Sequence, residues 1–257
     1  MEFFMRFIGL DGLRGLMCLW VVVGHTVTMA GFNLNESQLS TKLLGQGLAV
    51  ELFFIISGFV ITLMFMNKNL PFKKYLSQRI LRIFPVYLLF LLITAAMLPI
   101  ALYVLQNFPV EIEKTASRLA FTEVSINDFV KHFIPHLLMA HGLIPNAILD
   151  KTAYTIMGQA WSLTLQFQFF IIAPFLFVCF RKNQVIFYAL ILMALCVEPV
   201  FKATMGHGSF ILANSKMFIV GILSAILLNH KVSAKISHKN FAIALFFCLL
   251  YCFSING

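Results

Sequence analysis

Residues 7–25 read FIGLDGLRGLMCLWVVVGH, an apolar stretch with an arginine near its start and a histidine deep inside it. These two polar residues are Arg14 and His25. A lipid bilayer disfavours such groups by several kcal/mol unless they serve a site or a pathway. Their separation of 11 residues corresponds to about three helical turns, or roughly 16 Å along one helix face. The stretch predicts a membrane helix that carries a cation and a titratable imidazole in line.

The composition of the whole chain is that of a membrane protein. Hydrophobic residues make up 60% of the 257 positions and charged residues only 11%, whereas globular chains contain about 25% charged residues. Several apolar runs approach the ~20 residues that a helix needs to cross a bilayer. The net charge of +9 comes from lysines and arginines in short connections, a pattern typical of positive-inside topology rather than of nucleic-acid binding. We therefore predict an all-α, polytopic transmembrane helical bundle.

We expect about seven to eight membrane helices and one re-entrant or interfacial segment. The broken segment covers residues 132–148, where Pro135, Gly142 and Pro145 interrupt a moderately apolar run. The predicted spans are residues 13–32, 43–66, 84–105, 158–180, 184–201, 210–228 and 241–255.

The basic connections predict the orientation of the chain. Lysines and arginines gather at residues 67–83, 181–182 and 230–239. If residues 132–148 do not cross the bilayer, all three connections lie on the same side as the N-terminus, which the positive-inside rule makes cytoplasmic. The acidic segment 107–131 then lies outside. We expect a multi-pass protein of the cytoplasmic membrane with its N-terminus in the cytoplasm.

Three further patterns combine with the first one. They are AVELFFIISGF at residues 49–59, YLSQRILRIFP at residues 75–85 and QAWSLTLQFQFF at residues 159–170. The first places the carboxylate of Glu51 inside an apolar run. The second places Arg79 and Arg82 three residues apart, on a shared helix face.

Together, and in this order, the four patterns resemble the integral-membrane acyltransferase family 3, which O-acylates cell-envelope polysaccharides and related glycans. The resemblance extends from about residue 7 to residue 174 and, more weakly, to residues 218–227. It implies that an acyl group passes from cytoplasmic acyl-CoA, with acetyl-CoA as the expected donor, to a hydroxyl of a carbohydrate. No bound cofactor is expected. The implied partners are acyl-CoA, the carbohydrate acceptor and the lipid bilayer, without nucleic acid.

The resemblance also implies site residues. The essential arginine and histidine of the family match Arg14 and His25, and its acidic position in the second helix matches Glu51. Its paired basic residues match Arg79 and Arg82, which we assign together with Arg14 to binding of the donor.

These residue types also suit the chemistry without the family. Transfer to a hydroxyl needs a base, and a histidine such as His25 is the usual choice near neutral pH. Alternatively, the imidazole carries the acyl group covalently. Glu51 can orient the imidazole or pair with Arg14. Coenzyme A is polyanionic, and its phosphates suit guanidinium groups at the membrane surface.

We assign Trp161, Ser162 and Gln166 to substrate binding, with packing and helix capping as the alternative for the first two. The family usually has a glutamate where this chain has Gln166. We expect one integral-membrane domain over residues 1–257, shorter than a typical family member. Two other functions stay open on this reasoning: a secondary transporter or glycan exporter, and an inactive relative of the acyltransferases.

The remaining polar residues of the apolar regions are interpreted more simply. His132, His136 and His141 lack a carboxylate partner in a recognisable metal motif, so we predict interfacial or substrate-contacting histidines and no metal site. Lys216 lies in the predicted span 210–228 and should face the bundle interior. It either pairs, for example with Glu198, or lines the path of the acceptor.

Overall fold

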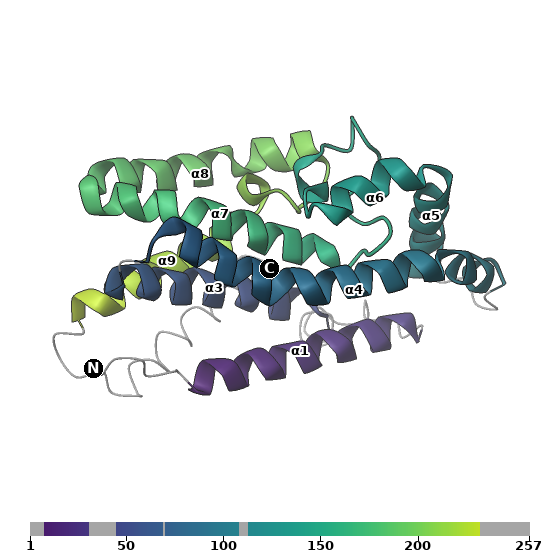
Figure 1. The fold of residues 1–257 in the computed structure, drawn as a ribbon, viewed down its shortest axis with the longest axis horizontal. Coiled ribbons are helices and arrows are strands. Elements are labelled where there is room, and N and C mark those ends of the chain that lie inside the picture. Colours follow the sequence, from purple (N-terminus) through teal and green to yellow (C-terminus); the bar gives the residue numbers. More distant parts are fainter. Residues whose placement is uncertain (1–7, 31–44, 69, 108–112, 232–257) are drawn as a thin grey trace. The chain divides into compact units, whose positions relative to one another are not determined.

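The computed structural model describes residues 8–30, 45–68, 70–107 and 113–231. Over these residues the regular secondary structure is helical throughout, which confirms the predicted all-α class. Figure 1 labels the helices along the chain. The described residues separate into two compact units. The first unit comes from Met1–Lys68 and Lys216–Gly257, and the second from Asn69–Ser215.

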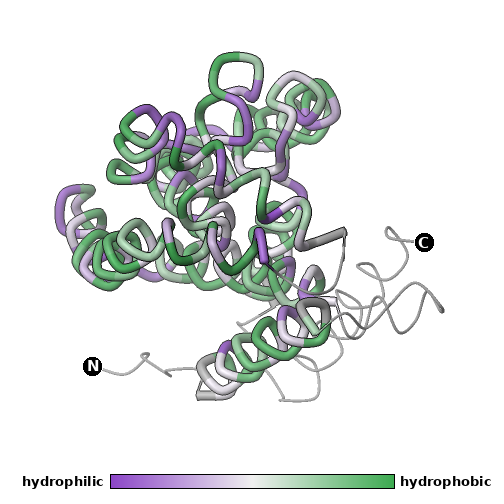
Figure 2. The backbone as a smooth tube through the Cα atoms, turned by 90° about the vertical axis from the view of Figure 1, so that its right-hand side faces the viewer, coloured by the Kyte–Doolittle hydropathy of each residue, from purple (hydrophilic) through white to green (hydrophobic). Residues whose placement is uncertain are grey.

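Four of the described helices are long and apolar enough to cross a membrane: α3 (Gly47–Asn67), α4 (Phe72–Gln106), α7 (Ala160–Lys182) and α8 (Gln184–Met205). Two further helices, α1 (Ile8–Met29) and α9 (Lys216–Lys231), contain shorter apolar stretches. Figure 2 shows that hydrophobic residues predominate along the helices, interrupted by short hydrophilic stretches. This is the composition of a helical membrane bundle. The predicted span 241–255 lies outside the described residues.

In the first unit, α3 packs against both α1 and α9. Two glycines bring the backbones of α3 and α9 close together. A Cβ atom on Gly58 would overlap the backbone carbonyl of Phe218, and one on Gly221 would overlap that of Ile55. The rings of Phe54 and Phe218 stack beside this contact, with centroids 4.8 Å apart. Small residues at such a crossing are typical of membrane helix pairs, because van der Waals packing drives their association.

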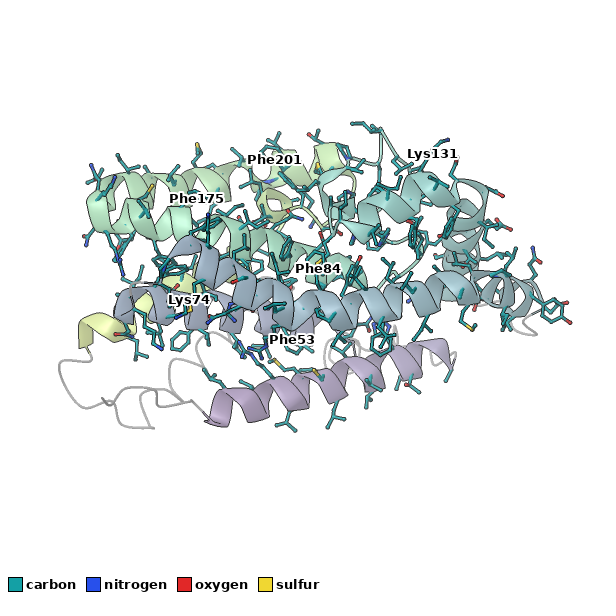
Figure 3. All side chains as sticks on the ribbon, viewed as in Figure 1. Phe53, Lys74, Phe84, Lys131, Phe175 and Phe201 are labelled. Atoms are coloured by element: carbon teal, nitrogen blue, oxygen red, sulfur yellow. The ribbon has the colours of Figure 1, made fainter. Side chains whose placement is uncertain are left out.

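In the second unit, α4 and α7 run antiparallel and meet through aromatic rings. The rings of Phe72 and Phe175 are 5.5 Å apart, and those of Phe84 and Phe167 are 5.3 Å apart. Figure 3 shows Phe84 on α4, with Lys74 nearer the start of the same helix. At about 1.5 Å per residue, the 35 residues of α4 span roughly 50 Å, longer than the ~30 Å hydrocarbon core.

α7 and α8 form a tight antiparallel hairpin in the second unit. Asn183 joins them, and its side-chain oxygen accepts hydrogen bonds from the backbone N–H groups of Val185 and Ile186, at 2.9 and 3.2 Å. This is an N-cap of α8. The helix ends at Met205 and is followed by its C-cap residue Gly206, which has a left-handed φ of 69°.

Two short helices follow α4 in the chain: α5 (Glu113–Asn127) and α6 (Phe129–Leu137). Residues 138–159, here named the connecting segment, then run irregularly to the start of α7. Their only regular element is the 3-10 turn η2 (His141–Leu143). The broken conformation predicted for residues 132–148 is thus observed. Met139, Ile156 and Met157 of this segment pack with Tyr87 and Leu91 of α4 in one apolar cluster.

Two helices begin at other residues than predicted. The basic connection 67–83 is largely helical, because α4 starts at Phe72 and continues through Pro85 without interruption. Proline is tolerated inside membrane helices when surrounding groups satisfy the freed backbone. The predicted span 210–228 is divided instead into η3 (Ile211–Ala213) and α9, which starts at Lys216.

Candidate active site

The first unit carries the three residues assigned to catalysis. Arg14 and His25 are both half-buried on α1, and Glu51 is half-buried on α3. Because α1 packs against α3, these residues belong to two neighbouring helices. The 11-residue spacing of Arg14 and His25 within one continuous helix places both on a common face.

The second unit carries the paired arginines, and the structure gives them different surroundings. Arg79 is half-buried, and its guanidinium carbon lies 5.5 Å from the ring centre of Tyr75 and 5.3 Å from that of Phe170. Both distances fall within the range of cation–π attraction. Arg82, one helical turn later, is exposed and lines a cavity. The sequence pattern did not separate the two roles.

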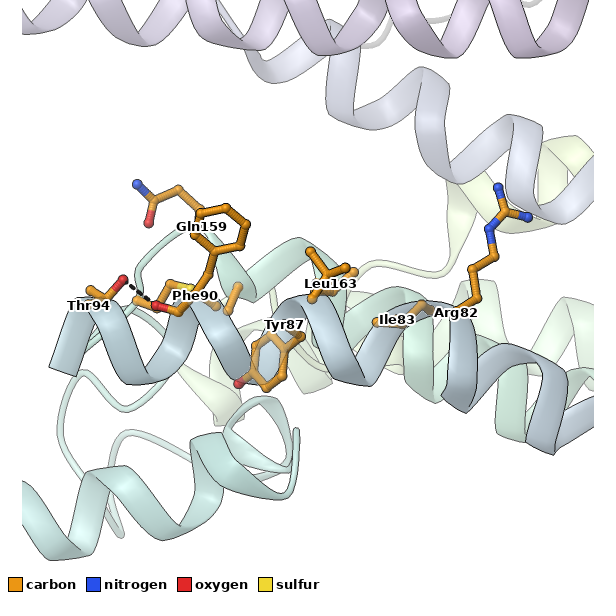
Figure 4. A pocket seen from close by; sticks show the side chains of 10 residues that line it. Arg82, Ile83, Tyr87, Phe90, Thr94, Gln159 and Leu163 are labelled. Carbon is orange, nitrogen blue, oxygen red and sulfur yellow. Dashed lines mark hydrogen bonds between the residues drawn. The ribbon is translucent and has the colours of Figure 1, made fainter. Parts of the chain in front are cut away.

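This cavity lies between α4 and the start of α7 and has a volume of about 540 Å³. Small-molecule sites have volumes of roughly 300–1,000 Å³. Arg82 lies at one end of the group of residues in Figure 4, with Gln159 and Thr94 at the other. The 12 residues from Arg82 to Thr94 correspond to roughly 18 Å along the helix. Between them the walls are mainly apolar, from Ile83, Val86, Tyr87, Phe90, Met157, Ala160 and Leu163.

The lining of the cavity therefore suits an amphiphilic ligand. One cation can meet an anionic group, and the apolar walls can take up a chain. The Thr94 hydroxyl already donates to the carbonyl of Phe90 at 2.8 Å. The side chain of Gln159 is exposed, so it is the main polar group available at that end.

Trp161, Ser162 and Gln166 all lie in the first two turns of α7, and each is half-buried. None of them is among the residues that line the cavity. The Ser162 hydroxyl donates to the backbone carbonyl of Gln159 at 3.3 Å. It does not cap α7, because the N-cap residue is Gln159 and no side-chain hydrogen bond caps the helix there. Their assignment to substrate binding stays a prediction.

Sequence reasoning missed Gln159 as a site residue, although it opens the quoted pattern 159–170. The signal that was present is its position immediately before the apolar run that forms α7. The cavity depends on residues about 70 positions apart in the chain, and a single sequence does not reveal that pairing.

The three histidines near the connecting segment are buried, not interfacial: His132 is 1% exposed, and His136 and His141 are 0% exposed. The ring of His136 stacks on that of His141, with centroids 3.9 Å apart and planes 9° apart. The hydroxyl of Thr155 lies 3.0 Å from Nδ1 of His132 and 3.4 Å from Nε2 of His136. The described residues contain no group of three or more side chains suited to a metal ion.

Burial governs the protonation of these histidines. Loss of solvation lowers the pKa of His136 to about 4 and that of His141 well below its ordinary value, and it also lowers the pKa of His132. A charged imidazole in such surroundings is disfavoured because it exchanges water for an apolar environment. All three rings are neutral at neutral pH, so each ring has one N–H and one lone pair.

Lys216 is the first residue of α9 and does not lie in the middle of a helix, which corrects the predicted span. The residue before it, Ser215, donates to the carboxylate of Glu198 through both its backbone N–H and its hydroxyl, each at 3.0 Å. The Glu198 carboxylate thus satisfies donors at the turn that precedes α9.

The comparisons with known proteins agree with these observations. The family model described as "Acyltransferase domain" matches residues 7–257. One curated relative, "Protein 2 in picA locus" of Rhizobium radiobacter, is 36% identical over 104 residues, which are 39% of this chain and 49% of the relative. The match thus spans about half the length of that relative. No solved structure matches. Because the family match covers nearly the whole chain, the protein belongs to the integral-membrane acyltransferase family 3.

Proposed function

We propose that this acyltransferase moves an acyl group, with acetyl as the expected group, from cytoplasmic acyl-CoA to a hydroxyl of a cell-envelope or exported carbohydrate. The observation that carries the proposal is an exposed arginine, Arg82, at the end of an apolar cavity in a membrane acyltransferase. Family membership favours this reaction over transport or glycan export.

The donor binds through its phosphates. Arg82 meets a phosphate at the cavity, and Arg79 adds positive charge one turn earlier in α4. The rings of Tyr75 and Phe170 hold the Arg79 guanidinium, which reduces the entropy lost when it binds an anion. In this proposal the thioester arm of the donor lies along the apolar walls, and Arg14 supplies a further cation.

In the transfer step, the carbon–sulfur bond of the thioester breaks and a carbon–oxygen bond to the acceptor forms. His25 takes the proton of the acceptor hydroxyl and passes it to the departing thiolate. In the alternative route, the acyl group first resides on the imidazole and then moves to the hydroxyl. Glu51 orients His25 or pairs with Arg14. Trp161, Ser162 and Gln166 contact the acceptor.

The direct test uses membranes that contain the protein, supplied with acetyl-CoA. We expect release of the free thiol and an acetyl increase in the mass of an envelope glycan. His25→Ala should abolish both signals while insertion into the membrane persists. Near-normal transfer by that variant would refute the mechanism.

The donor site predicts a change in the Michaelis constant. A charge-assisted hydrogen bond contributes about 1.5–3 kcal/mol, so Arg82→Ala should raise the KM for acyl-CoA roughly ten-fold or more. Full recovery in Arg82→Lys would indicate a point charge, whereas partial recovery would indicate a two-pronged guanidinium contact. An unchanged KM in Arg82→Ala would remove this arginine from the donor site.

The route also requires an orientation, with the N-terminus in the cytoplasm and the arginines of α4 on the cytoplasmic side. Ser117 on α5 should then lie outside and Gln184, at the start of α8, inside. Cysteines placed at these two exposed positions can be treated in intact cells with a thiol reagent that does not cross membranes. We expect labelling at position 117 alone, and labelling at 184 alone would invert the topology.

A further inference from the structure

We infer that His136 is a positioning residue for the cavity: through the connecting segment it holds Gln159 in place beside α4. That His136 positions Gln159 follows from the fold and does not depend on the activity of the protein. The effect of this positioning on acyl transfer rests on the proposed function.

The backbone of His136 is tied directly to a wall of the cavity. The hydroxyl of Tyr87 donates to the carbonyl of His136 at 2.6 Å, in a buried setting. The same tyrosine lines the cavity and belongs to the apolar cluster beside it. This hydrogen bond fixes the end of α6, where His136 lies, relative to the cavity wall on α4. A shift of His136 therefore displaces Tyr87 or breaks the bond.

The side chain of His136 holds the connecting segment. Its Nε2 atom lies 3.1 Å from the backbone carbonyl oxygen of Thr152. A carbonyl only accepts hydrogen bonds, so this contact assigns the ring N–H to Nε2. The hydroxyl of Thr155 lies close to the same nitrogen, to His132 and to the Thr152 carbonyl. Residues 152–155 are thus held by two buried imidazoles.

The segment needs this support because its backbone is strained. Among the described residues, those other than glycine with positive φ are Met139, Lys151 and Ile156, at 54°, 55° and 53°. All three lie in the connecting segment. A β-branched residue such as Ile156 rarely adopts this conformation, which persists only where surrounding contacts over-determine it. Ile156 is also held by its N–H, which donates to the hydroxyl of Ser125 on α5 at 2.8 Å.

The strained residue lies directly before the cavity. Met157, Gln159 and Ala160 follow Ile156 within four positions, and all three line the cavity. If the hydrogen bond from His136 to Thr152 is lost, the segment can relax to an ordinary backbone conformation. Because Ala160 starts α7 and is fixed by that helix, the relaxation falls on the residues between, including Gln159.

Two substitutions separate the hydrogen bond from the shape of the ring. His136→Phe keeps a flat ring that can stack on His141 but has no N–H for Thr152. His136→Gln keeps an N–H donor and loses the ring. The proposal predicts that the phenylalanine variant frees Gln159 and that the glutamine variant does so much less.

The readout is the mobility of a nitroxide spin label on Gln159→Cys, in the full chain in detergent micelles with its five native cysteines replaced by alanine. We expect a clear gain in label mobility with His136→Phe, little change with His136→Gln, and none in either variant for a label on Gln184→Cys. Equal mobility at position 159 in the phenylalanine variant and its parent would overturn the proposal. An equal gain in both variants would also overturn it, since the N–H would then be irrelevant.

Tyr87→Phe provides a second, milder test if His136→Phe does not fold. It removes only the hydroxyl that binds the His136 carbonyl, and it should also raise the mobility of the label at position 159. An unchanged label in Tyr87→Phe would count against the inference.

Kinetic measurements then test whether the position of Gln159 affects acyl transfer. We expect His136→Phe and Gln159→Ala each to raise a substrate KM roughly ten-fold, the equivalent of one hydrogen bond. The double variant should be no worse than either single one, with kcat changed less than KM. Simple multiplication of the two effects would show that His136 does not act through Gln159. Failure of the parent protein to transfer acyl groups would contradict the proposed function but leave the label result standing.

Discussion

The α3–α9 contact of the first unit and the connecting segment of the second unit are both tightly packed, but different forces hold them. The helices α3 and α9 meet through glycine backbones and apolar side chains. The connecting segment is held by hydrogen bonds among buried polar groups and carries strained backbone. The first arrangement tolerates no added volume, whereas the second tolerates no lost donor or acceptor.

The largest expected effect is on the glycine contact. Gly221→Val would place side-chain atoms against the backbone of Ile55 and Phe59, which cannot move aside without separating the helices. Overpacking typically costs about 1–3 kcal/mol, and more against rigid backbone. We expect the midpoint of thermal unfolding in detergent to fall by many degrees.

The matched control for this glycine is Gly47→Ala, at the first position of α3, where a Cβ atom would meet nothing within 4 Å. It should leave the midpoint nearly unchanged. A Gly221→Val protein as stable as its parent would show that the two helices do not pack closely.

The buried histidines of the second unit should make the stability of the protein depend on pH. The pKa of His136 is about 4 in the folded protein and 6.5 ordinarily, so between these values the unfolded chain binds more protons than the folded one. The contribution of the neutral His136 to the free energy of unfolding is fully present above pH 6.5. It declines as the pH falls towards 4, by on the order of 3 kcal/mol. The lowered pKa values of His132 and His141 act in the same direction.

Thermal unfolding measured from pH 7.5 down to pH 5 tests this dependence. His136→Gln cannot titrate and should flatten part of the decline. An identical pH profile in the parent and this variant would mean that His136 is not held neutral by burial.

The smallest expected effect concerns one buried hydroxyl. Thr164 on α7 donates to the carbonyl of Met139 at 2.6 Å, at the strained start of the connecting segment. Thr164→Val keeps the shape and removes the donor, which should cost about 1–2 kcal/mol. The exposed Thr204 donates only to its own helix, so Thr204→Val should change the stability by a few tenths of a kcal/mol. Equal losses of stability at both positions would show that the buried Thr164 hydroxyl contributes no more than the exposed Thr204 hydroxyl.

Much of the architecture followed from composition and order. The helical class, the broken conformation near residues 132–148 and the family were predicted correctly, because long apolar runs and ordered motifs are local properties of a chain. The ends of helices were predicted less well. The α4 helix starts twelve residues before the apolar run, since Tyr75 and Arg79 pack against neighbouring groups inside the second unit.

The sequence by itself determined that this protein is helical, that it belongs to the integral-membrane acyltransferase family 3, and which cations and imidazoles its apolar stretches contain. Only the tertiary structure decided that Arg82 lines a cavity while Arg79 packs on aromatic rings, and that Gln159 joins Arg82 there. It also decided that His136 is buried and hydrogen-bonded to Thr152. The physical reason is that hydropathy acts residue by residue along the chain. A cavity or a buried hydrogen bond requires partners that are distant in sequence.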